Sequence, residues 1–231
     1  MSDFKELKEI AYKANMMLPE NRVVIFTFGN VSAFDKENRV FAIKPSGVVY
    51  SDLKAEDMVI VDLSYNVIEG RLNPSSDTKT HAVLYQHFPN IGGICHTHST
   101  FAVAWSQAMR SIPVYGTTHA DHLSADIPCT KVMADEMIRG DYEEATGFQI
   151  VEAFKNISYE EIQMVLVACH GPFTWGATAE KAVYNSVILE ELARMAMLTE
   201  QIDSDTPRMK STLIDKHYLR KHGKDAYYGQ V

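Results

Sequence analysis

Residues 91–98, Ile91-Gly92-Gly93-Ile94-Cys95-His96-Thr97-His98, form an apolar stretch that ends in a His-x-His pair. A short apolar run bounded by turn residues predicts a buried β-strand. Because side chains at i and i+2 of a strand lie on one face, about 7 Å apart, His96 and His98 can converge on one metal ion. The pair alone does not separate a metal site from a chance occurrence among the nine histidines of the chain.

A second apolar stretch, Met164–His170, also ends in a histidine, and a Gly171-Pro172 turn follows it. Three histidines at strand ends fit a catalytic zinc site, which keeps one coordination position open for water or substrate. Cys95 and Cys169 each precede a histidine of this set. Strand alternation turns them to the opposite face, so we expect buried thiols and not metal ligands.

The rest of the chain mixes helical and strand patterns. Helices are expected at Asp3–Leu18 (capped by Asp3 and stopped by Pro19), Thr78–Phe88, Thr100–Met109, Gln149–Lys155, Thr178–Ile202 and Arg208–His222. Further strands are expected at Val23–Phe28, Val40–Ile43, Met58–Val61 and Asn66–Ile68. The turn signals between these strands predict one antiparallel sheet, and Ser111–Cys129 is expected to be rich in loops.

The composition is that of a globular protein with one sizeable core. Hydrophobic residues make up 46% and charged residues 23% of the 231 residues, close to the average for soluble domains. One domain over residues 1–231 is therefore expected. The net charge of −8 argues against nucleic-acid binding, which needs a basic face.

The chain is also expected to be cytoplasmic and to have no membrane partner. It has no signal-peptide order at its N-terminus and no run near the ~20 apolar residues of a membrane span. Its three cysteines, Cys95, Cys129 and Cys169, have no disulfide-framework spacing, which favours reduced thiols.

Several loop residues have the chemistry of an anion site. Ser75, Ser76 and Asp77 precede the helix expected at Thr78, where hydroxyls and free backbone N–H groups suit a phosphate. On its own, Asp77 is better explained as an ordinary helix cap. Lys44, beside Pro45-Ser46-Gly47, and the Gly29-Asn30 turn can supply further donors, although each is a common loop feature.

Two later segments concentrate polar side chains. Thr117-Thr118-His119-Ala120-Asp121-His122 packs hydroxyl and titratable groups into a loop, which favours a functional role. The C-terminal stretch carries Lys216, His217, Arg220, Lys221 and Lys224, and then Tyr227-Tyr228. Cations favourable near a helix C-terminus, followed by an exposed tail, account for that stretch equally well.

Taken together and in order, these elements resemble the L-ribulose-5-phosphate 4-epimerases of the class II aldolase superfamily along essentially the whole chain. The matching segments are Thr27-Phe28-Gly29-Asn30-Val31-Ser32, Ile43-Lys44-Pro45-Ser46-Gly47, Pro74-Ser75-Ser76-Asp77-Thr78, His96-Thr97-His98, Gly116-Thr117-Thr118-His119-Ala120-Asp121, Cys169-His170-Gly171-Pro172-Phe173, Lys216-His217-Tyr218-Leu219-Arg220-Lys221-His222-Gly223 and Ala226-Tyr227-Tyr228-Gly229-Gln230.

The resemblance implies a fold, a set of ligands and an assembly. The implied fold is a single-domain, three-layer α/β/α arrangement with a mainly antiparallel central sheet. The implied zinc site is His96, His98 and His170, with Asp77 at or near the metal. The substrate is implied to contact Gly29, Asn30, Lys44, Ser46, Gly47, Ser75, Ser76, Thr117, His217 and Arg220. Asp121 and Tyr228 are implied to be the acid/base residues. The family forms homotetramers with active sites between subunits, so Asp121, His217, Arg220 and Tyr228 would serve a neighbour's site.

The implied reaction interconverts two phosphorylated pentuloses, L-ribulose 5-phosphate and D-xylulose 5-phosphate. The C4 proton is not acidified enough for direct removal, and no Gly-x-Gly-x-x-Gly motif opens a nicotinamide site. A retro-aldol step followed by re-addition fits, with zinc as Lewis acid and two acid/base groups on opposite faces. Related aldolases for fuculose or rhamnulose phosphate usually carry glutamate where this chain has Asp77, which favours the epimerase.

Two other functions remain open at the sequence level. One is a class II aldolase that releases its aldehyde product. The other is a binding or scaffold domain with a structural zinc, which would need a fourth protein ligand to close the site. The metal could be another first-row divalent ion. Arabinose and ascorbate breakdown both use the epimerase reaction.

Overall fold

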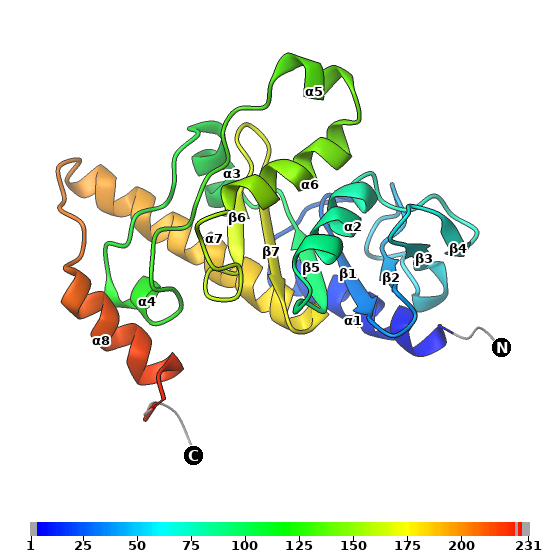
Figure 1. Cartoon of the computed structure of the whole chain (residues 1–231), viewed down its shortest axis with the longest axis horizontal. Helices are drawn as coiled ribbons and strands as arrows, with labels where there is room; N and C mark the ends of the chain where they lie inside the picture. Colours follow the sequence, from blue (N-terminus) through cyan, green and yellow to red (C-terminus); the bar gives the residue numbers. More distant parts are fainter. Residues whose placement is uncertain (1–3, 225, 228–231) are drawn as a thin grey trace.

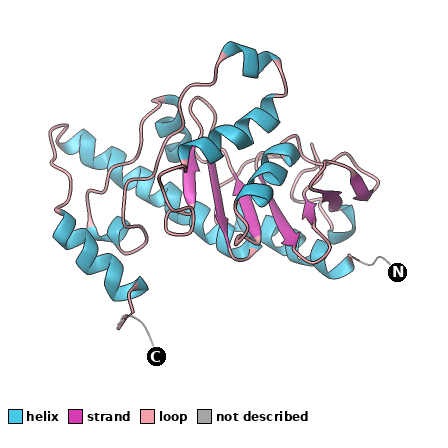
Figure 2. Ribbon diagram, in the orientation of Figure 1, coloured by secondary structure: helices cyan, strands magenta, loops and turns pink. Residues whose placement is uncertain are grey.

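The computed structural model describes residues 4–224 and 226–227, and its centre is a seven-stranded sheet in which all neighbouring strands are antiparallel. The strand order is β4-β3-β2-β1-β5-β7-β6 (Figure 2). The strands are β1 (Asn30–Asp35), β2 (Val40–Ile43), β3 (Val59–Asp62), β4 (Val67–Glu69), β5 (Gly93–His96), β6 (Met164–Leu166) and β7 (Pro172–Gly176). The stretch that opened the sequence, β5, therefore lies inside the sheet between β1 and β7.

Helices cover both faces of the sheet (Figure 1). They are α1 (Lys5–Glu20), α2 (Thr78–His87), α3 (Thr100–Gln107), α4 (Thr117–Ala120), α5 (Asp135–Arg139), α6 (Tyr142–Ala153), α7 (Ala179–Ile202) and α8 (Ser211–His222), with a 3-10 turn at Ala55–Asp57. Helix α1 and the first half of α7 pack on one face, whereas α2 and α6 lie over the other. The predicted three-layer arrangement with a mainly antiparallel sheet is thus confirmed.

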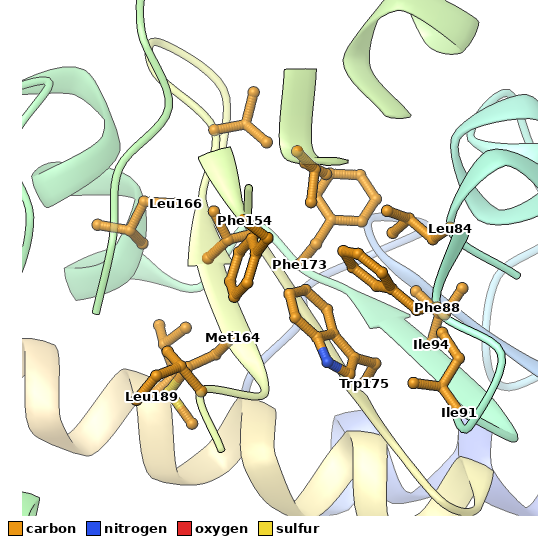
Figure 3. Packing of buried hydrophobic residues seen from close by; sticks show 14 of the residues in the cluster. Leu84, Phe88, Ile91, Ile94, Phe154, Met164, Leu166, Phe173, Trp175 and Leu189 are labelled. Carbon is orange, nitrogen blue, oxygen red and sulfur yellow. The ribbon is translucent and has the colours of Figure 1, made fainter. Parts of the chain in front are cut away.

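Strand alternation divides the buried side chains between two cores. In β2, Phe41 and Ile43 join the core under α2 and α6, while Val40 and Ala42 join the core under α1. The larger core centres on Trp175, whose ring lies 5.2 Å from Phe88 (centroid to centroid) and 5.0 Å from Phe154 (Figure 3). Because both faces are buried, the sheet strands carry apolar residues at successive positions and not only at alternate ones.

Two strands were missed because each begins directly after a turn signal. β1 starts at Asn30, one residue after Gly29, which has φ +78°. β7 starts at Pro172, the first position of a strand, where a missing N–H is tolerated. The predicted turns at Gly29-Asn30 and Gly171-Pro172 therefore lead straight into the sheet.

The strand predicted at Val23–Phe28 is wrong. This segment is a loop in which Phe26 has φ +53° and the Phe28 N–H bonds the Ile25 carbonyl at 3.0 Å. Ile25 and Phe26 are 61% and 77% exposed. Val23 at the start of the segment is buried, but the apolar residues after Val24 do not join the core within one chain.

The predicted helices differ from the observed ones mainly at their ends. Helix α1 continues to Glu20 with Pro19 inside its last turn, and Asp3 lies outside the described residues. Helix α6 begins seven residues before the predicted start at Gln149, at Tyr142, because Asp141 caps it by accepting the Glu144 N–H. Within the described chain, no helix is long and apolar enough to span a membrane.

Replacing Gly147 with alanine is expected to destabilise the protein by about 1–3 kcal/mol, because it overpacks the contact between α2 and α6. A Cβ at Gly147 would lie 2.7 Å from Cβ of the fully buried Val83. That clash should outweigh the roughly 1 kcal/mol that alanine normally adds inside a helix. Urea denaturation measures the effect, with Gly116→Ala, whose added Cβ meets no atom within 4 Å, as the control. An equally or more stable Gly147→Ala protein would contradict the prediction.

Candidate metal centre and anion pocket

Three histidines from two segments of the chain meet at one end of the sheet. His96 is the last residue of β5, His98 follows two residues later, and His170 lies in the turn between β6 and β7. Their ring centroids are 4.8–5.2 Å apart. Each offers a ligand nitrogen, and these atoms all lie within 4.8 Å of one another. The triad is thus compact enough to hold one ion.

The surroundings of the triad match the needs of a metal site. The Nδ1 of His96 donates to the Pro172 carbonyl at 2.9 Å, which leaves Nε2 as its ligand atom. Burial, with His96 nearby, lowers the pKa of His98 and lowers that of His170 to about 4. Both rings are therefore neutral at pH 7, the form that binds metal. Three imidazoles suit zinc and similar first-row ions.

Gly29 permits the approach of the neighbouring loop. Its φ of +78° favours glycine, and an added Cβ would lie 2.9 Å from the His96 carbonyl oxygen. The loop can therefore lie directly against the end of β5.

Asp77 lies beside the triad and is not an ordinary cap, since its side chain accepts no capping hydrogen bond from α2. Its Oδ2 instead accepts from Asn30 Nδ2 at 2.7 Å and from Ser75 Oγ at 3.4 Å. Burial alone would raise the pKa of Asp77, but His96, His81 and the Asn30 hydrogen bond lower it. A negative charge therefore adjoins the three histidines, which a cation would balance.

One turn further along α2, a second polar contact joins the helix to β1. Ser32 Oγ lies 2.7 Å from both His81 Nδ1 and the Tyr85 hydroxyl. The buried atoms Asn30 Oδ1 and His81 Nε2 have no hydrogen-bond partner among the described residues. Polar groups thus extend from the triad into the space between β1 and α2.

A pocket of about 330 Å³ opens beside the triad. It is lined by Thr27, Phe28, Gly29, Asn30, Lys44, Pro45, Ser46, Gly47, Ser75, Ser76, Asp77, His96, His98 and His170. The pocket therefore brings together all four predicted metal residues. It also contains the predicted phosphate-binding residues that lie between Gly29 and Ser76. A larger pocket, about 800 Å³, lies between α1 and β4 and contains none of the predicted site residues.

The anion side of the pocket is built from two loops that bond to each other. The Ser46 N–H donates to the Asn73 carbonyl at 2.9 Å, and the Ser75 N–H donates to the Lys44 carbonyl at 3.0 Å. The Ser75 N–H, expected to be free for a phosphate, is thus engaged in the structure, and so is the Ser46 N–H. Further donors that line the pocket are the Ser46 and Ser76 hydroxyls and the Lys44 ammonium, whereas the Ser75 hydroxyl donates to Asp77 at 3.4 Å.

Lys44 is buried with weak hydrogen-bond partners. Its Nζ lies 3.5 Å from the Thr27 carbonyl, 3.4 Å from the Pro45 carbonyl and 5.0 Å from the centre of the Tyr50 ring. Burial lowers its pKa to about 8. The ammonium is charged at neutral pH, and an anion in the pocket would stabilise that charge.

A second polar cluster forms where α4 meets α8. Arg220 donates to both carboxylate oxygens of Asp121, at 2.8 Å each, and His217 Nδ1 lies 2.9 Å from Oδ1. Lys221 adds a charge 3.7 Å from Oδ2. Burial alone would raise the pKa of Asp121, but these partners lower it. Asp121 is therefore an ionised carboxylate at neutral pH.

This cluster lies apart from the triad in one chain. Helices α4 and α8 lie beyond β6, at the end of the molecule opposite β4 (Figure 1). Thr117 is the first residue of α4 and is exposed. Tyr228 lies outside the described residues. The structure thus brings the predicted residues into two groups, with Asp121, Thr117, His217 and Arg220 in the second.

Some predicted features have structural roles or different surroundings. His119, in the polar 117–122 segment, is buried, and its Nε2 lies 3.1 Å from the Ala125 carbonyl. Cys95 is buried as predicted, but Cys169 is exposed with φ +61°, because β6 ends at Leu166 and strand alternation stops before it. Tyr142, whose hydroxyl lies 3.3 Å from His170 Nδ1, was missed because it belongs to no motif.

Solved structures show the same fold. An L-fuculose 1-phosphate aldolase is 23% identical, with a TM-score of 0.79 over 95% of this chain and 97% of that one. An L-fuculose 1-phosphate aldolase from Glaciozyma antarctica PI12 is 18% identical (TM-score 0.76; 96% and 84% covered). YgbL from Klebsiella pneumoniae, described as a putative aldolase/epimerase/decarboxylase, is 21% identical (TM-score 0.71; 94% and 99% covered). The fold is therefore that of the class II aldolases.

The sequence agrees with this fold class. Residues 9–197 match the family model described as the class II aldolase and adducin N-terminal domain. The chain belongs to this family.

Sulfate binding to the metal-free protein is expected to weaken as the pH rises from about 7 to 9.5, since Lys44 loses its charge above its pKa of about 8. Sulfate itself does not titrate in this range. Affinity should fall by up to roughly tenfold per pH unit above pH 8. Isothermal titration calorimetry measures it, and Lys44→Met should bind more weakly with a flat pH profile. Equal wild-type affinity at both ends of the range would rule out Lys44 as the anion's partner.

Proposed function

We propose that this protein is a metal-dependent sugar-phosphate epimerase that interconverts L-ribulose 5-phosphate and D-xylulose 5-phosphate. The observation that carries the proposal is the three-histidine cluster opening into a pocket lined by Lys44 and serine hydroxyls. A metal site and an anion site in one pocket suit a substrate with oxygens at one end and a phosphate at the other. Membership of the class II aldolase family supports this chemistry.

The phosphate would lie against the Ser46 and Ser75 loops, with Gly29, Asn30, Gly47, Ser76 and Lys44 around it. In this position the C2 and C3 oxygens of the sugar would face His96, His98 and His170, which would hold zinc. A bound zinc ion would stabilise the negative charge of an enediolate as a Lewis acid. Asp77 lies next to the triad and would lie at or near the metal.

The inversion at C4 would need two proton-transfer groups. A base removes the C4 hydroxyl proton, the C3–C4 bond breaks, and its electron pair enters the enediolate. The aldehyde fragment, glycolaldehyde phosphate, stays bound by its phosphate and rotates to present its other face. C3 then attacks again, and an acid on the opposite side returns a proton to the C4 oxygen. Asp121 and Tyr228 are proposed for these two roles.

Asp121 would reach the triad of a neighbouring copy and not that of its own chain. Its cluster with His217 and Arg220 lies on α4 and α8, beyond the β6 edge (Figure 1). Exposed apolar side chains, including Phe26 and Phe28, lie on the loop that borders the pocket. An apolar covering by a second copy would bury them. We propose a homotetramer with active sites between subunits, in which Thr117 also contacts substrate.

The main alternative is a class II aldolase that releases its aldehyde. Two solved structures of similar fold are described as L-fuculose 1-phosphate aldolases. Because their sequence identity to this chain is low, the similarity supports a shared fold and not a shared reaction. Asp77 favours the epimerase, because its side chain is one methylene shorter than the glutamate usual in the related aldolases and would not reach the same substrate proton. It is also held by hydrogen bonds from Asn30 and Ser75. A scaffold domain with structural zinc is less well supported, since the described ligand group holds three residues and not four.

The purified protein is expected to convert L-ribulose 5-phosphate into D-xylulose 5-phosphate without accumulating free aldehyde. Coupled assays for the ketose product and for glycolaldehyde phosphate separate epimerase from aldolase activity. Activity should disappear with a chelator and return with added zinc, because the triad would no longer hold its ion. Aldehyde release at the rate of substrate loss would identify an aldolase instead, and turnover unaffected by chelation would exclude a metal role.

Two inactive variants are expected to restore each other's activity when refolded together. His96→Asn removes a triad residue and Asp121→Asn removes the proposed acid/base group. In a shared site, mixed assemblies contain some interfaces with both groups intact, about a quarter of the total at equal mixing. Activity regained only after mixing, with each variant refolded alone as the control, supports sites between subunits. No recovery from correctly assembled mixtures would place both groups in one chain.

A further inference from the structure

His170 comes from the turn between β6 and β7, whereas the other two histidines come from the end of β5 and the residues after it. His96 ends a strand paired on both sides, and His98 directly precedes the N-cap of α3. His170 follows the exposed, left-handed Cys169 in the turn between β6 and β7. A histidine that ligates a metal usually donates its other ring N–H to a partner that fixes the orientation of the ring.

Tyr142 at the start of α6 is that partner. Its hydroxyl lies 3.3 Å from His170 Nδ1, and the two ring centroids are 6.1 Å apart. Tyr142 does not line the pocket. Its contact with the triad is therefore the one between its hydroxyl and His170.

The position of Tyr142 is itself fixed by α2, the helix that follows Asp77. Lys79 forms an ion pair with Asp141, the residue before Tyr142. Thr80 Oγ1 donates to the Glu143 carbonyl at 2.6 Å. The contact of Gly147 with Val83 packs the next turn of α6 on α2. The start of α6 is thus bound to the same helix whose first turn adjoins the triad.

We propose that Tyr142 is a positioning residue for the metal site: it accepts the Nδ1–H of His170 and so fixes this ring to bind metal through Nε2. The proposal rests on the proposed function, since it requires that the triad bind an ion. A neutral imidazole carries one proton, so a ring that ligates through Nε2 must donate through Nδ1. His96 shows the same arrangement, with the Pro172 carbonyl as acceptor.

Tyr142→Phe removes the hydroxyl and keeps the ring. Zinc affinity, measured by competition with a chromophoric chelator, should fall roughly 10–100-fold, the usual loss when a partner of a metal ligand is removed. Tyr65→Phe is the matched control: its hydroxyl bonds Glu144 of the same helix at 2.7 Å but does not contact the triad. That variant should keep wild-type zinc affinity.

A second readout separates positioning from a general loosening of α6. Long-range ¹H–¹⁵N spectra report which ring nitrogen of His170 carries the proton in the metal-free protein. The wild type and Tyr65→Phe should show an Nδ1–H form, and Tyr142→Phe a mixture of both forms. Unchanged zinc affinity in Tyr142→Phe, an equal loss in Tyr65→Phe, or an unchanged tautomer would each overturn the proposal. A wild-type protein that binds no zinc would instead overturn the proposed function.

Discussion

The pairing of β5 with a neighbour on each side is the constraint on which the site depends. His96 stands opposite Asn30 of β1 on one side and Phe173 of β7 on the other. This register brings the start of β1 at Asn30 and the turn that carries His170 to one end of the sheet. A slip of a single residue would turn His96 to the other face, because strand side chains alternate. Strand β5 thus contributes to the core, and its backbone hydrogen bonds also fix the position of His96.

The second constraint is the polar contact between β1 and α2. Asn30 bonds Asp77, and two residues further along the strand Ser32 meets His81 and Tyr85. Residues two apart on a strand share one face, and residues four apart on a helix share one face. The contacts of β1 with α2 can therefore repeat over two helical turns. Leaving one buried member unpaired would cost about 1–3 kcal/mol. The contacts therefore fix α2, and with it Asp77, relative to β5.

Much of the fold and half of the site could be predicted from sequence, and the failures have physical reasons. Val40–Ile43 was predicted to the residue because its burial on both faces leaves a clear apolar run. Asn30–Asp35 was missed because its first residue follows a glycine turn, and Val23–Phe28 was misjudged because Ile25, Phe26 and Phe28 are exposed in a single chain. Local motifs indicated the triad and the serine loops. Tyr142 could not be found in this way, since its partner is 28 residues away and only the fold joins them.

The order of the strands also has a consequence for how the site forms during folding. Strands β1 to β4 follow one another along the chain and pair as neighbours, and the longest connection among them is residues 44–58. β5 and β7 are joined by a long excursion through four helices, and closing such a loop costs more entropy and slows folding. His170 can join His96 and His98 only after this late pairing. An ion bound by all three histidines would therefore stabilise the pairing of β6 and β7 with the rest of the sheet. It would favour the fully folded state over one in which these two strands are detached.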